Sequence, residues 1–379
     1  MFADRCKTKQ GISSVAVIAI IVVIIVIVAG ASAYMLLQAP KSSSSSSSSS
    51  TTTTSTFTTS SGSSTTITTI ASSNSSSSLK IAYIASGPCN DLGYYQGGCV
   101  AVKNMSSFAT IGIADSVADA DYTSVAQQFV NQGYNIIFGQ GFEAIGPFSQ
   151  LAPKYPNTLF ACACLPPLNS NSSNFIYYYA DNSGAAYLGG VLAAYLTKTN
   201  HLGFISGLGI PAVWAYENGF RLGAWSVNKS IQISSVFTQD FNDPSKAFQA
   251  ASGLVQQGVD FIYVGESPGG TGAYQEASQA HIYAMGNEFD QNSLANQTIV
   301  TSAVAIWYPV MHQIVVDYQN HSWKSGYVCG IRQGCADIAS FHGLVPSSLV
   351  TKVMGVRQGI LNGTITVPLI DDHEVTSPP

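Results

Sequence analysis

Hydrophobic and polar positions follow three different patterns along the chain. From Ile12 to Leu37 no residue is charged, and from Ser42 to Ser78 nearly every residue is Ser or Thr. From Leu79 onward, short apolar runs alternate with amphipathic stretches. In order, these patterns predict a membrane-spanning helix, a disordered segment and a region in which strands and helices alternate.

The uncharged segment is long enough to cross a bilayer. At about 1.5 Å per residue, Ile12–Leu37 makes a helix of roughly 39 Å, whereas a bilayer core is about 30 Å thick. Three basic residues, Arg5, Lys7 and Lys9, precede it, so the positive-inside rule places the N-terminus in the cytoplasm and the rest of the chain outside. A buried core helix is the alternative, and the length and the flanks argue against it.

Processing of this N-terminal region stays open. The small residues from Ala29 to Ala33 offer a cleavage region of the secretory type. Lys9-Gln-Gly11-Ile-Ser-Ser14 resembles an archaeal prepilin-type leader, which is cut after the Gly and leaves the apolar helix on the mature protein. We therefore expect a leader over 1–11 and a membrane anchor over 12–37, with cleavage after Gly11, near Ala33 or not at all.

The Ser/Thr-rich region 38–78 has too few apolar side chains to offset the entropy cost of ordering, and we expect a disordered stalk. Asn-x-Ser/Thr sequons fit an external, glycosylated chain, although such sequons also arise by chance in Ser/Asn-rich sequence. They occur at Asn74, Asn104, Asn171, Asn228, Asn296, Asn320 and Asn362.

Cysteine spacing predicts disulfide bonds. All cysteines except Cys6 follow the apolar segment and form an even set in an oxidising space. Short loops favour Cys89–Cys99 and Cys329–Cys335, which leaves Cys162 and Cys164; the other connectivities stay open. A zinc site is the rival explanation, but the sequence has no Cys-x-x-Cys and no His cluster, so we expect no metal.

Beyond Leu79 the pattern is that of an α/β protein. The apolar runs predict strands at Ile81–Ala85, Asn135–Phe138, Thr158–Ala163, Leu202–Ile205, Ile231–Phe237, Asp260–Val264, Tyr283–Gly286 and Thr298–Val304. The amphipathic stretches predict helices at about 92–108, 127–132, 144–154, 185–198, 213–227, 244–257, 271–280 and 307–320. Such alternation favours right-handed crossovers and two doubly wound parallel sheets.

Charge narrows the possible partners. The chain has a net charge of −5, and only 9% of its residues are charged. It therefore lacks the basic patch that phosphate contacts require, and nucleic acid is excluded as a partner.

In doubly wound sheets, ligands bind beyond the carboxyl ends of the strands. The residues that follow the predicted strands are therefore our candidates for ligand binding. They are Asn90, Asp91, Tyr94, Gly141, Phe142, Tyr216, Gly269, Glu288 and Asp290. The alternatives are that Tyr94 and Tyr216 pack one lobe against the other, and that Asp91 serves as a helix-start charge.

These positions also carry a family resemblance. Asn90-Asp-Leu-Gly-Tyr-Tyr-Gln96, Gly133–Phe142, Tyr187–Ala194, Pro211–Phe220, Asp243-Pro and Asp290-Gln291 occur in the order found in one family. From about Lys80 to Pro368 the sequence resembles the Bmp/PnrA-like (basic membrane protein) substrate-binding proteins of ABC transporters.

The resemblance implies a type I periplasmic-binding-protein fold, in which two lobes joined by a hinge close on a small molecule. The lobes would comprise 79–182 with about 305–328, and 183–304 with about 329–368, followed by a tail over 369–379. It further implies an ABC permease as partner, no cofactor, and often a purine nucleoside as ligand.

By the same resemblance, Tyr94 and Tyr216 stack on the base, while Asp91, Glu288 and Asp290 lie at or near the polar positions. Tyr95 replaces a frequent Asn, Glu288 replaces an Asp, and a common Lys is missing near Ala305. A different small polar ligand therefore stays open.

Two other classes compete with a receptor. Gly265-Glu-Ser267-Pro-Gly269 matches the Gly-x-Ser-x-Gly motif of hydrolases, but Pro268 lacks the N–H that would stabilise an oxyanion. We therefore expect no enzyme. A pilin-like structural protein is the third class; its N-terminal helix would allow several copies to associate, in addition to solute capture.

Overall fold

The computed structural model describes residues 51–58, 62, 64–74, 78–166, 168 and 171–379. The predicted leader and the predicted anchor, residues 1–37, lie outside this part of the chain. In the described ranges, no helix combines the length and the apolar character that crossing a bilayer requires. The folded elements all belong to one compact unit, which runs from residue 50 to residue 379.

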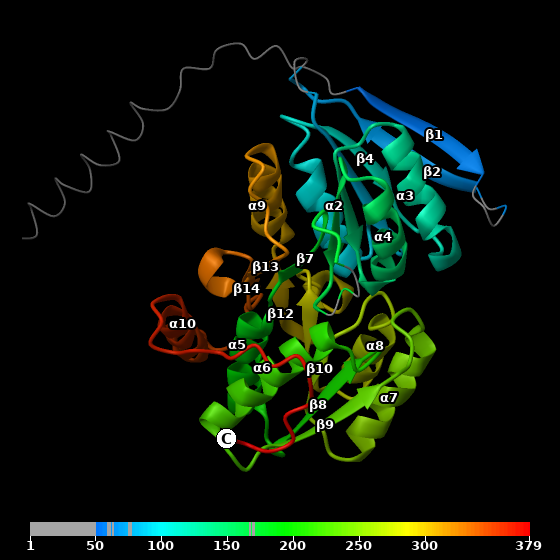
Figure 1. Ribbon diagram of the computed structural model, residues 1–379. Helices are drawn as coiled ribbons and strands as arrows, with labels where there is room; N and C mark the ends of the chain where they lie inside the picture. Colours follow the sequence, from blue (N-terminus) through cyan, green and yellow to red (C-terminus); the bar gives the residue numbers. More distant parts are fainter. Residues whose placement is uncertain (1–50, 59–61, 63, 75–77, 167, 169–170) are drawn as a thin grey trace, which may run out of the picture. The chain divides into compact units, whose positions relative to one another are not determined.

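Two β-sheets organise this unit (Figure 1). The first sheet has eight strands, in the order β1-β2-β4-β3-β5-β6-β7-β13. Its strands are β1 (Thr52–Thr58), β2 (Ser64–Ile70), β3 (Lys80–Ala85), β4 (Thr110–Ala114), β5 (Ile136–Gln140), β6 (Leu159–Ala163), β7 (Phe175–Ala180) and β13 (Gly326–Cys329). Strands β4 to β13 of this order are parallel, whereas β1 and β2 are antiparallel to their neighbours.

The second sheet has six strands, in the order β14-β12-β11-β10-β8-β9. They are β8 (His201–Ser206), β9 (Gln232–Phe237), β10 (Phe261–Val264), β11 (Tyr283–Glu288), β12 (Ile299–Ala305) and β14 (Ala336–Ile338). Only β14 is antiparallel to its neighbour. The α/β class is therefore confirmed, but both sheets are mixed rather than wholly parallel, because antiparallel strands were added at one edge of each.

Helices connect most of the parallel strands. They are α2 (Tyr94–Lys103), α3 (Tyr122–Asn131), α4 (Ile145–Leu151), α5 (Ser183–Leu196), α6 (Pro211–Val227), α7 (Pro244–Gln256), α8 (Thr271–Gln279), α9 (Trp307–Gln319) and α10 (Ser347–Leu361). Short 3-10 turns occupy Asp119–Asp121, Phe142–Ala144, Ala152–Lys154, Asn292–Leu294 and Ile331–Gln333. The chain passes from the first sheet to the second after β7, back after β12, and across again after β13.

Apolar side chains cover both faces of each sheet. In β3, Tyr83 packs in the core that contains α2 and α9, whereas its neighbour Ile84 packs with α3 and α4. In β8, Phe204 packs with α5, α6 and α10, and Ile205 packs with α7 and α8. Because successive side chains of a strand point to opposite faces, a continuous apolar run such as Ile81–Ala85 is what a doubly covered strand requires.

Local signals set several helix boundaries. Asp243 accepts a hydrogen bond from the backbone N–H of Ser245 and caps α7, whose first residue is Pro244. Gly133 and Gly258 follow the ends of α3 and α7 with φ values of 75° and 89°, a left-handed conformation that glycine adopts at little cost.

Residues 52–58 and 64–70 correct the expectation of a disordered stalk. Strands β1 and β2 form a hairpin, and β2 pairs with β4 at the edge of the first sheet. Ile67 is fully buried in the core beside Ile84 and Tyr122. Low apolar content was therefore a poor guide here: Thr is β-branched and favours strands, and the edge of β4 supplies a ready partner.

Three disulfides join cysteines that are close in sequence: Cys89–Cys99, Cys162–Cys164 and Cys329–Cys335. Their Cα–Cα separations are 5.7, 5.4 and 5.5 Å, within the range for bridged cysteines. The first links the β3–α2 loop to α2, so it constrains the segment that carries Tyr94.

Candidate functional site

A cavity of about 400 Å³ lies between the two sheets, where the carboxyl ends of their parallel strands face each other. This volume falls within the usual range for small-molecule sites. The first sheet contributes the residues after β5 and β6 and the start of α2. The second sheet contributes the residues after β8, β9 and β10 and the end of β11.

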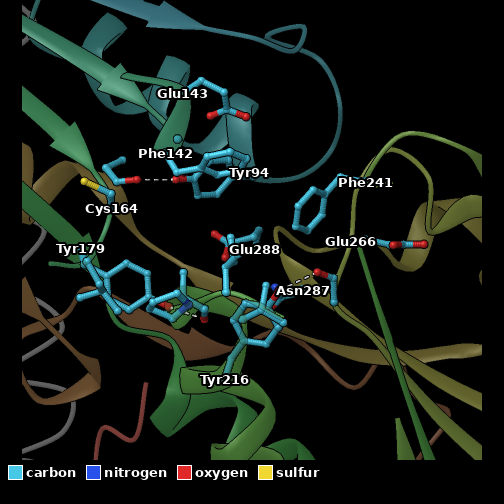
Figure 2. Close-up of a pocket in the computed structure, with 18 of the residues that line it drawn as sticks. Tyr94, Phe142, Glu143, Cys164, Tyr179, Tyr216, Phe241, Glu266, Asn287 and Glu288 are labelled. Carbon is cyan, nitrogen blue, oxygen red and sulfur yellow. Dashed lines mark hydrogen bonds between the residues drawn. The ribbon is translucent and has the colours of Figure 1, made fainter. Parts of the chain in front are cut away.

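Tyr94 and Tyr216 stand on opposite sides of this cavity, with Glu288 between them (Figure 2). The Tyr94 hydroxyl donates to the carbonyl oxygen of Ala163 at 2.9 Å, and its ring packs edge-on against Trp307. The Tyr216 hydroxyl donates to the carbonyl oxygen of Gly265 at 2.7 Å. The hydrogen bonds of the two hydroxyl groups therefore fix the positions of both rings.

Glu288 ends β11 and is only 7% exposed. It has a φ of 66°, a left-handed conformation that costs a non-glycine residue on the order of 1 kcal/mol. Its Oε1 accepts a hydrogen bond from Asn182 at 3.3 Å, and its Oε2 has no hydrogen-bond partner in the described part of the chain. The strained backbone thus holds a buried carboxyl group at the wall of the cavity.

Burial, and after it the nearby charge of Asp91, raises the pKa of Glu288 to about 8. The side chains of Trp307 and Asn182 act in the opposite direction on this pKa. At neutral pH, Glu288 is therefore close to its titration midpoint and can either donate or accept a hydrogen bond.

Glu143 is a second acidic group at the cavity, in the turn that follows β5. Its Oε2 is shielded from solvent and has no partner among the described residues. Burial raises the pKa of Glu143 to about 7; a hydrogen bond from its own backbone N–H acts in the opposite direction, and the charge of Asp119 contributes to the rise. Gly141 makes this arrangement possible, because its φ is 116° and a Cβ there would strike the Glu143 carboxyl group.

Glu266 is the third acidic group at the cavity. It lies two residues after the end of β10, directly after Gly265. It is 4% exposed; its Oε2 accepts a hydrogen bond from Thr238 at 3.0 Å, and its Oε1 has no partner in the described ranges. Burial raises its pKa to about 7, helped by the charges of Asp240 and Asp243. Among the described residues that line the cavity there is no Lys, Arg or His.

The structure brings five of the predicted residues to this cavity: Tyr94, Gly141, Phe142, Tyr216 and Glu288. It does not bring the other four there. Of these, Asn90 is exposed in the turn before α2. The N–H of Gly269 donates to the carbonyl oxygen of Phe241, so Gly269 supports a wall residue from behind.

The two remaining predicted carboxylates have other partners. Asp91 accepts hydrogen bonds from the N–H groups of Gly93, Tyr95 and Gln96, which makes it a helix-start carboxylate for α2. Asp290 bonds to the His342 side chain and to the N–H of Asn292. Both carboxyl groups therefore form their hydrogen bonds with residues outside the cavity.

Sequence reasoning missed Glu143, Glu266, Tyr95, Tyr179, Phe241 and Asn287, all of which line the cavity. Glu143 and Glu266 could have been predicted, since they directly follow Phe142 and Gly265 at the ends of predicted strands. Tyr179 lies inside β7, and no signal at a strand end marks it.

The Gly-x-Ser-x-Gly motif is also at the cavity, through Ser267. Its hydroxyl lies 3.5 Å from the N–H of Tyr94 and accepts a hydrogen bond from it. No histidine lines the cavity or bonds to Ser267 within the described residues. The arrangement gives Ser267 neither a base nor, because of Pro268, an oxyanion donor at the following residue.

Comparison with known proteins agrees with this geometry. Residues 78–371 match the family model described as ABC transporter substrate-binding protein, PnrA-like. A purine-binding protein of Brucella abortus is 28% identical over 69% of this chain and 75% of its own length. A nucleoside-binding protein of a Lactococcus lactis ABC transporter is 27% identical over 66% of this chain and 75% of its own length.

Solved structures show the same fold. An ABC transporter solute-binding protein from Conexibacter woesei aligns with a TM-score of 0.63 at 20% identity, over 77% of this chain and 99% of its own. One from Aeropyrum pernix aligns with a TM-score of 0.64 at 19% identity, over 78% of this chain and 94% of its own.

Proposed function

This chain belongs to the PnrA-like family of ABC transporter substrate-binding proteins, and on that premise we propose that it captures a nucleoside, with purine nucleosides favoured. It delivers the ligand to a membrane permease, and no bond is made or broken. The observation that carries the proposal is the cavity itself, where fixed tyrosine rings from both sides and buried glutamate side chains form the walls.

The energetics suit such a ligand. Stacking on an aromatic ring contributes roughly 1–3 kcal/mol per contact, and hydrogen bonds to charged groups roughly 1.5–3 kcal/mol each. Two rings and two carboxyl groups can therefore offset the entropy cost of association and reach micromolar affinity, which corresponds to about 8 kcal/mol. A sugar diol and the N–H groups of a base are the donors that carboxylates accept.

Ligand capture occurs, in this proposal, by closure of two lobes, one built on each sheet. The chain segments that cross between the sheets serve as the hinge. Contacts between the lobes already exist in the structure: Gln291 donates to the carbonyl oxygen of Leu92 at 2.9 Å, and Tyr179 donates to that of Ala212 at 3.1 Å. These two bonds, together with the hydrogen bond from the Tyr94 N–H to the Ser267 hydroxyl, stabilise the closed state.

The family's proteins are extracellular or membrane-associated, and we further propose a single-pass anchor at Ile12–Leu37 that holds the binding domain outside the cell. The uncharged length of this segment and the basic residues before it support the proposal. Association of several copies through the same helix would place several receptors around one permease.

A thermal-shift screen of the full-length chain in detergent tests the ligand class. A nucleoside at a hundredfold excess over its Kd adds about 2.7 kcal/mol to the free energy of unfolding, so we expect Tm to rise by several degrees. Tyr94→Ala should abolish the rise and Tyr94→Phe should keep it. Tyr283→Ala, which removes an exposed ring outside the cavity, is the matched control. A shift with sugars or vitamins alone would replace the nucleoside as ligand.

A further inference from the structure

The Asn-x-Ser/Thr sequons are not spread evenly over the fold. All of them except Asn362 lie shortly before a strand of the parallel part of a sheet. Parallel strands begin at the edge of a sheet opposite their carboxyl ends, so these sequons share the edge that faces away from the cavity, here called the distal edge. They are Asn74 before β3, Asn104 before β4, Asn171 before β7, Asn228 before β9, Asn296 before β12 and Asn320 before β13.

The crossover helices explain half of this pattern. Asn104, Asn228 and Asn320 are the C-terminal capping residues of α2, α6 and α9. A crossover helix carries the chain from the carboxyl end of one parallel strand back to the start of the next, so its C-terminus lies at the distal edge. The position of these sequons therefore follows from the topology of both sheets, not from one stretch of biased sequence.

Asparagines also occur near the carboxyl ends of the strands, but these have no Ser or Thr two positions later. They are Asn90, Asn182, Asn242 and Asn287, and the residues two positions later are Leu92, Gly184, Pro244 and Phe289. Asn90 and Asn242 are exposed, so exposure alone does not distinguish the two edges. Sequons that arose by chance would occur at both edges, whereas the observed arrangement keeps a bulky modification away from the cavity.

Exposure distinguishes the sequons within the distal edge. Asn228 is half-buried: its Nδ2 donates to Oδ1 of Asn200 at 3.1 Å, and its Oδ1 accepts from the N–H of Ser230 at 3.0 Å. The nitrogen to which a sugar would be attached is therefore already engaged. The other distal sequons begin with exposed asparagines, namely Asn74, Asn104, Asn171, Asn296 and Asn320.

Resting on the proposed function, which places this domain outside the cell, we propose that the exposed sequons of the distal edge carry N-linked glycans and that the cavity edge stays bare. The co-reactant is a lipid-linked oligosaccharide phosphate in the membrane. The asparagine Nδ2 forms a bond to the anomeric carbon of the first sugar, and the bond from that carbon to the phosphate oxygen breaks. The lipid phosphate leaves with the electron pair, and the amide nitrogen loses one proton.

The low charge of the chain gives these glycans a role. Only 9% of the residues are charged, whereas about 25% is typical of soluble domains, so few charged groups hydrate the surface. Glycans are bulky and solubilising, and their hydroxyl groups bind water without adding charge. At the distal edge they supply this hydration without covering the cavity or lying between the facing strand ends, so nucleoside entry and lobe closure stay unhindered.

Glycopeptide mass spectrometry of the full-length chain, purified in detergent from the membranes of the cells that produce it, tests the proposal. We expect a glycan on each exposed distal asparagine and none on Asn228. Asn104→Gln and Asn320→Gln should each remove one glycan from the intact protein, and Asn228→Gln, the matched control, should remove none. A variant with Gln at every exposed distal asparagine should bind adenosine with a Kd within about twofold of wild type and should aggregate at lower concentration.

Unmodified asparagine at all the exposed distal sequons would overturn the proposal, as would a glycan on Asn228 as abundant as those on the exposed asparagines. With glycans present on wild type, a change of more than about twofold in the adenosine Kd of the multiple variant would also overturn it, because the sugars would then reach the cavity. The mapping needs no variant, so it decides the question even where the multiple variant fails to fold. Bare asparagines leave nucleoside capture intact, whereas glycosylated wild-type protein that binds no nucleoside contradicts the proposed function instead.

Discussion

At the scale of single residues, the buried carboxyl groups make stability depend on pH. Burial raises the pKa of Glu288 to about 8, and those of Glu143 and Glu266 to about 7. In the unfolded chain these groups ionise near their ordinary value of 4.5. The folded protein therefore holds more protons between about pH 4.5 and pH 8, and its free energy of unfolding falls as pH rises through that window.

Glu288→Gln should flatten this dependence. Glu288 alone contributes a loss of roughly 2–4 kcal/mol between pH 5 and pH 8, and a neutral glutamine removes that share. Urea denaturation of the unliganded full-length chain at both pH values measures the slope, with Glu276→Gln, at a glutamate of α8 outside the cavity, as control. An unchanged slope in Glu288→Gln would show that Glu288 titrates normally in the folded protein.

Asp91 was predicted to bind the ligand, but in the structure its carboxylate stabilises the start of α2. Because it accepts three N–H groups at the start of α2, Asp91→Ala should lower the free energy of unfolding by about 1–2 kcal/mol. Asn90→Ala, one exposed residue earlier, should stay within about 0.5 kcal/mol of wild type. Stability can be measured by urea denaturation. Lost nucleoside affinity with unchanged stability would instead restore a direct role in binding.

At the scale of elements, local pattern predicted the interior strands and missed those that depend on remote partners. The run Ile81–Ala85 identified β3, because a strand covered on both faces must be apolar throughout. Strand β7 was missed, although its Phe, Ile and Tyr residues favour strands, and so was the short β4. The β1–β2 hairpin pairs with β4, a contact that composition does not encode.

Ile67 tests whether this hairpin is part of the folded domain. It is fully buried in β2, so Ile67→Ala should lower the free energy of unfolding by about 2–4 kcal/mol. Thr66→Ala, the exposed neighbour in the same strand, should change it by less than about 0.5 kcal/mol. Equal, negligible effects in urea denaturation would mean that β1 and β2 are not part of the folded domain and belong to a disordered stalk.

At the scale of the whole molecule, the order of the motifs identified the family, which the family match confirms, and the rule of strand ends located the cavity. The same rule could not say which polar groups stay free. Within the described ranges, Glu288 keeps an oxygen without a partner, whereas Asp91 and Asp290 use theirs on neighbouring residues. That distinction depends on side-chain packing between distant segments, which spacing along the chain does not contain.

The charge of the cavity predicts rejection of anions. Among the described residues that line the cavity, three carry carboxyl groups and none carries a basic group. A phosphate would therefore enter without a counter-charge. We expect adenosine monophosphate to bind at least about 100-fold more weakly than adenosine at pH 8. Competition of the nucleotide against bound adenosine measures this ratio, and comparable affinities would mean that the phosphate finds a cation elsewhere.

The central claim is that a nucleoside is held between the two sheets, and a crystal structure of the protein grown with saturating adenosine tests it most directly. The account predicts density for adenosine between Tyr94 and Tyr216, with the Glu288 carboxyl group within hydrogen-bond distance of the ligand. Adenosine bound at another surface, or a cavity that stays free of ligand density at saturation, would contradict it.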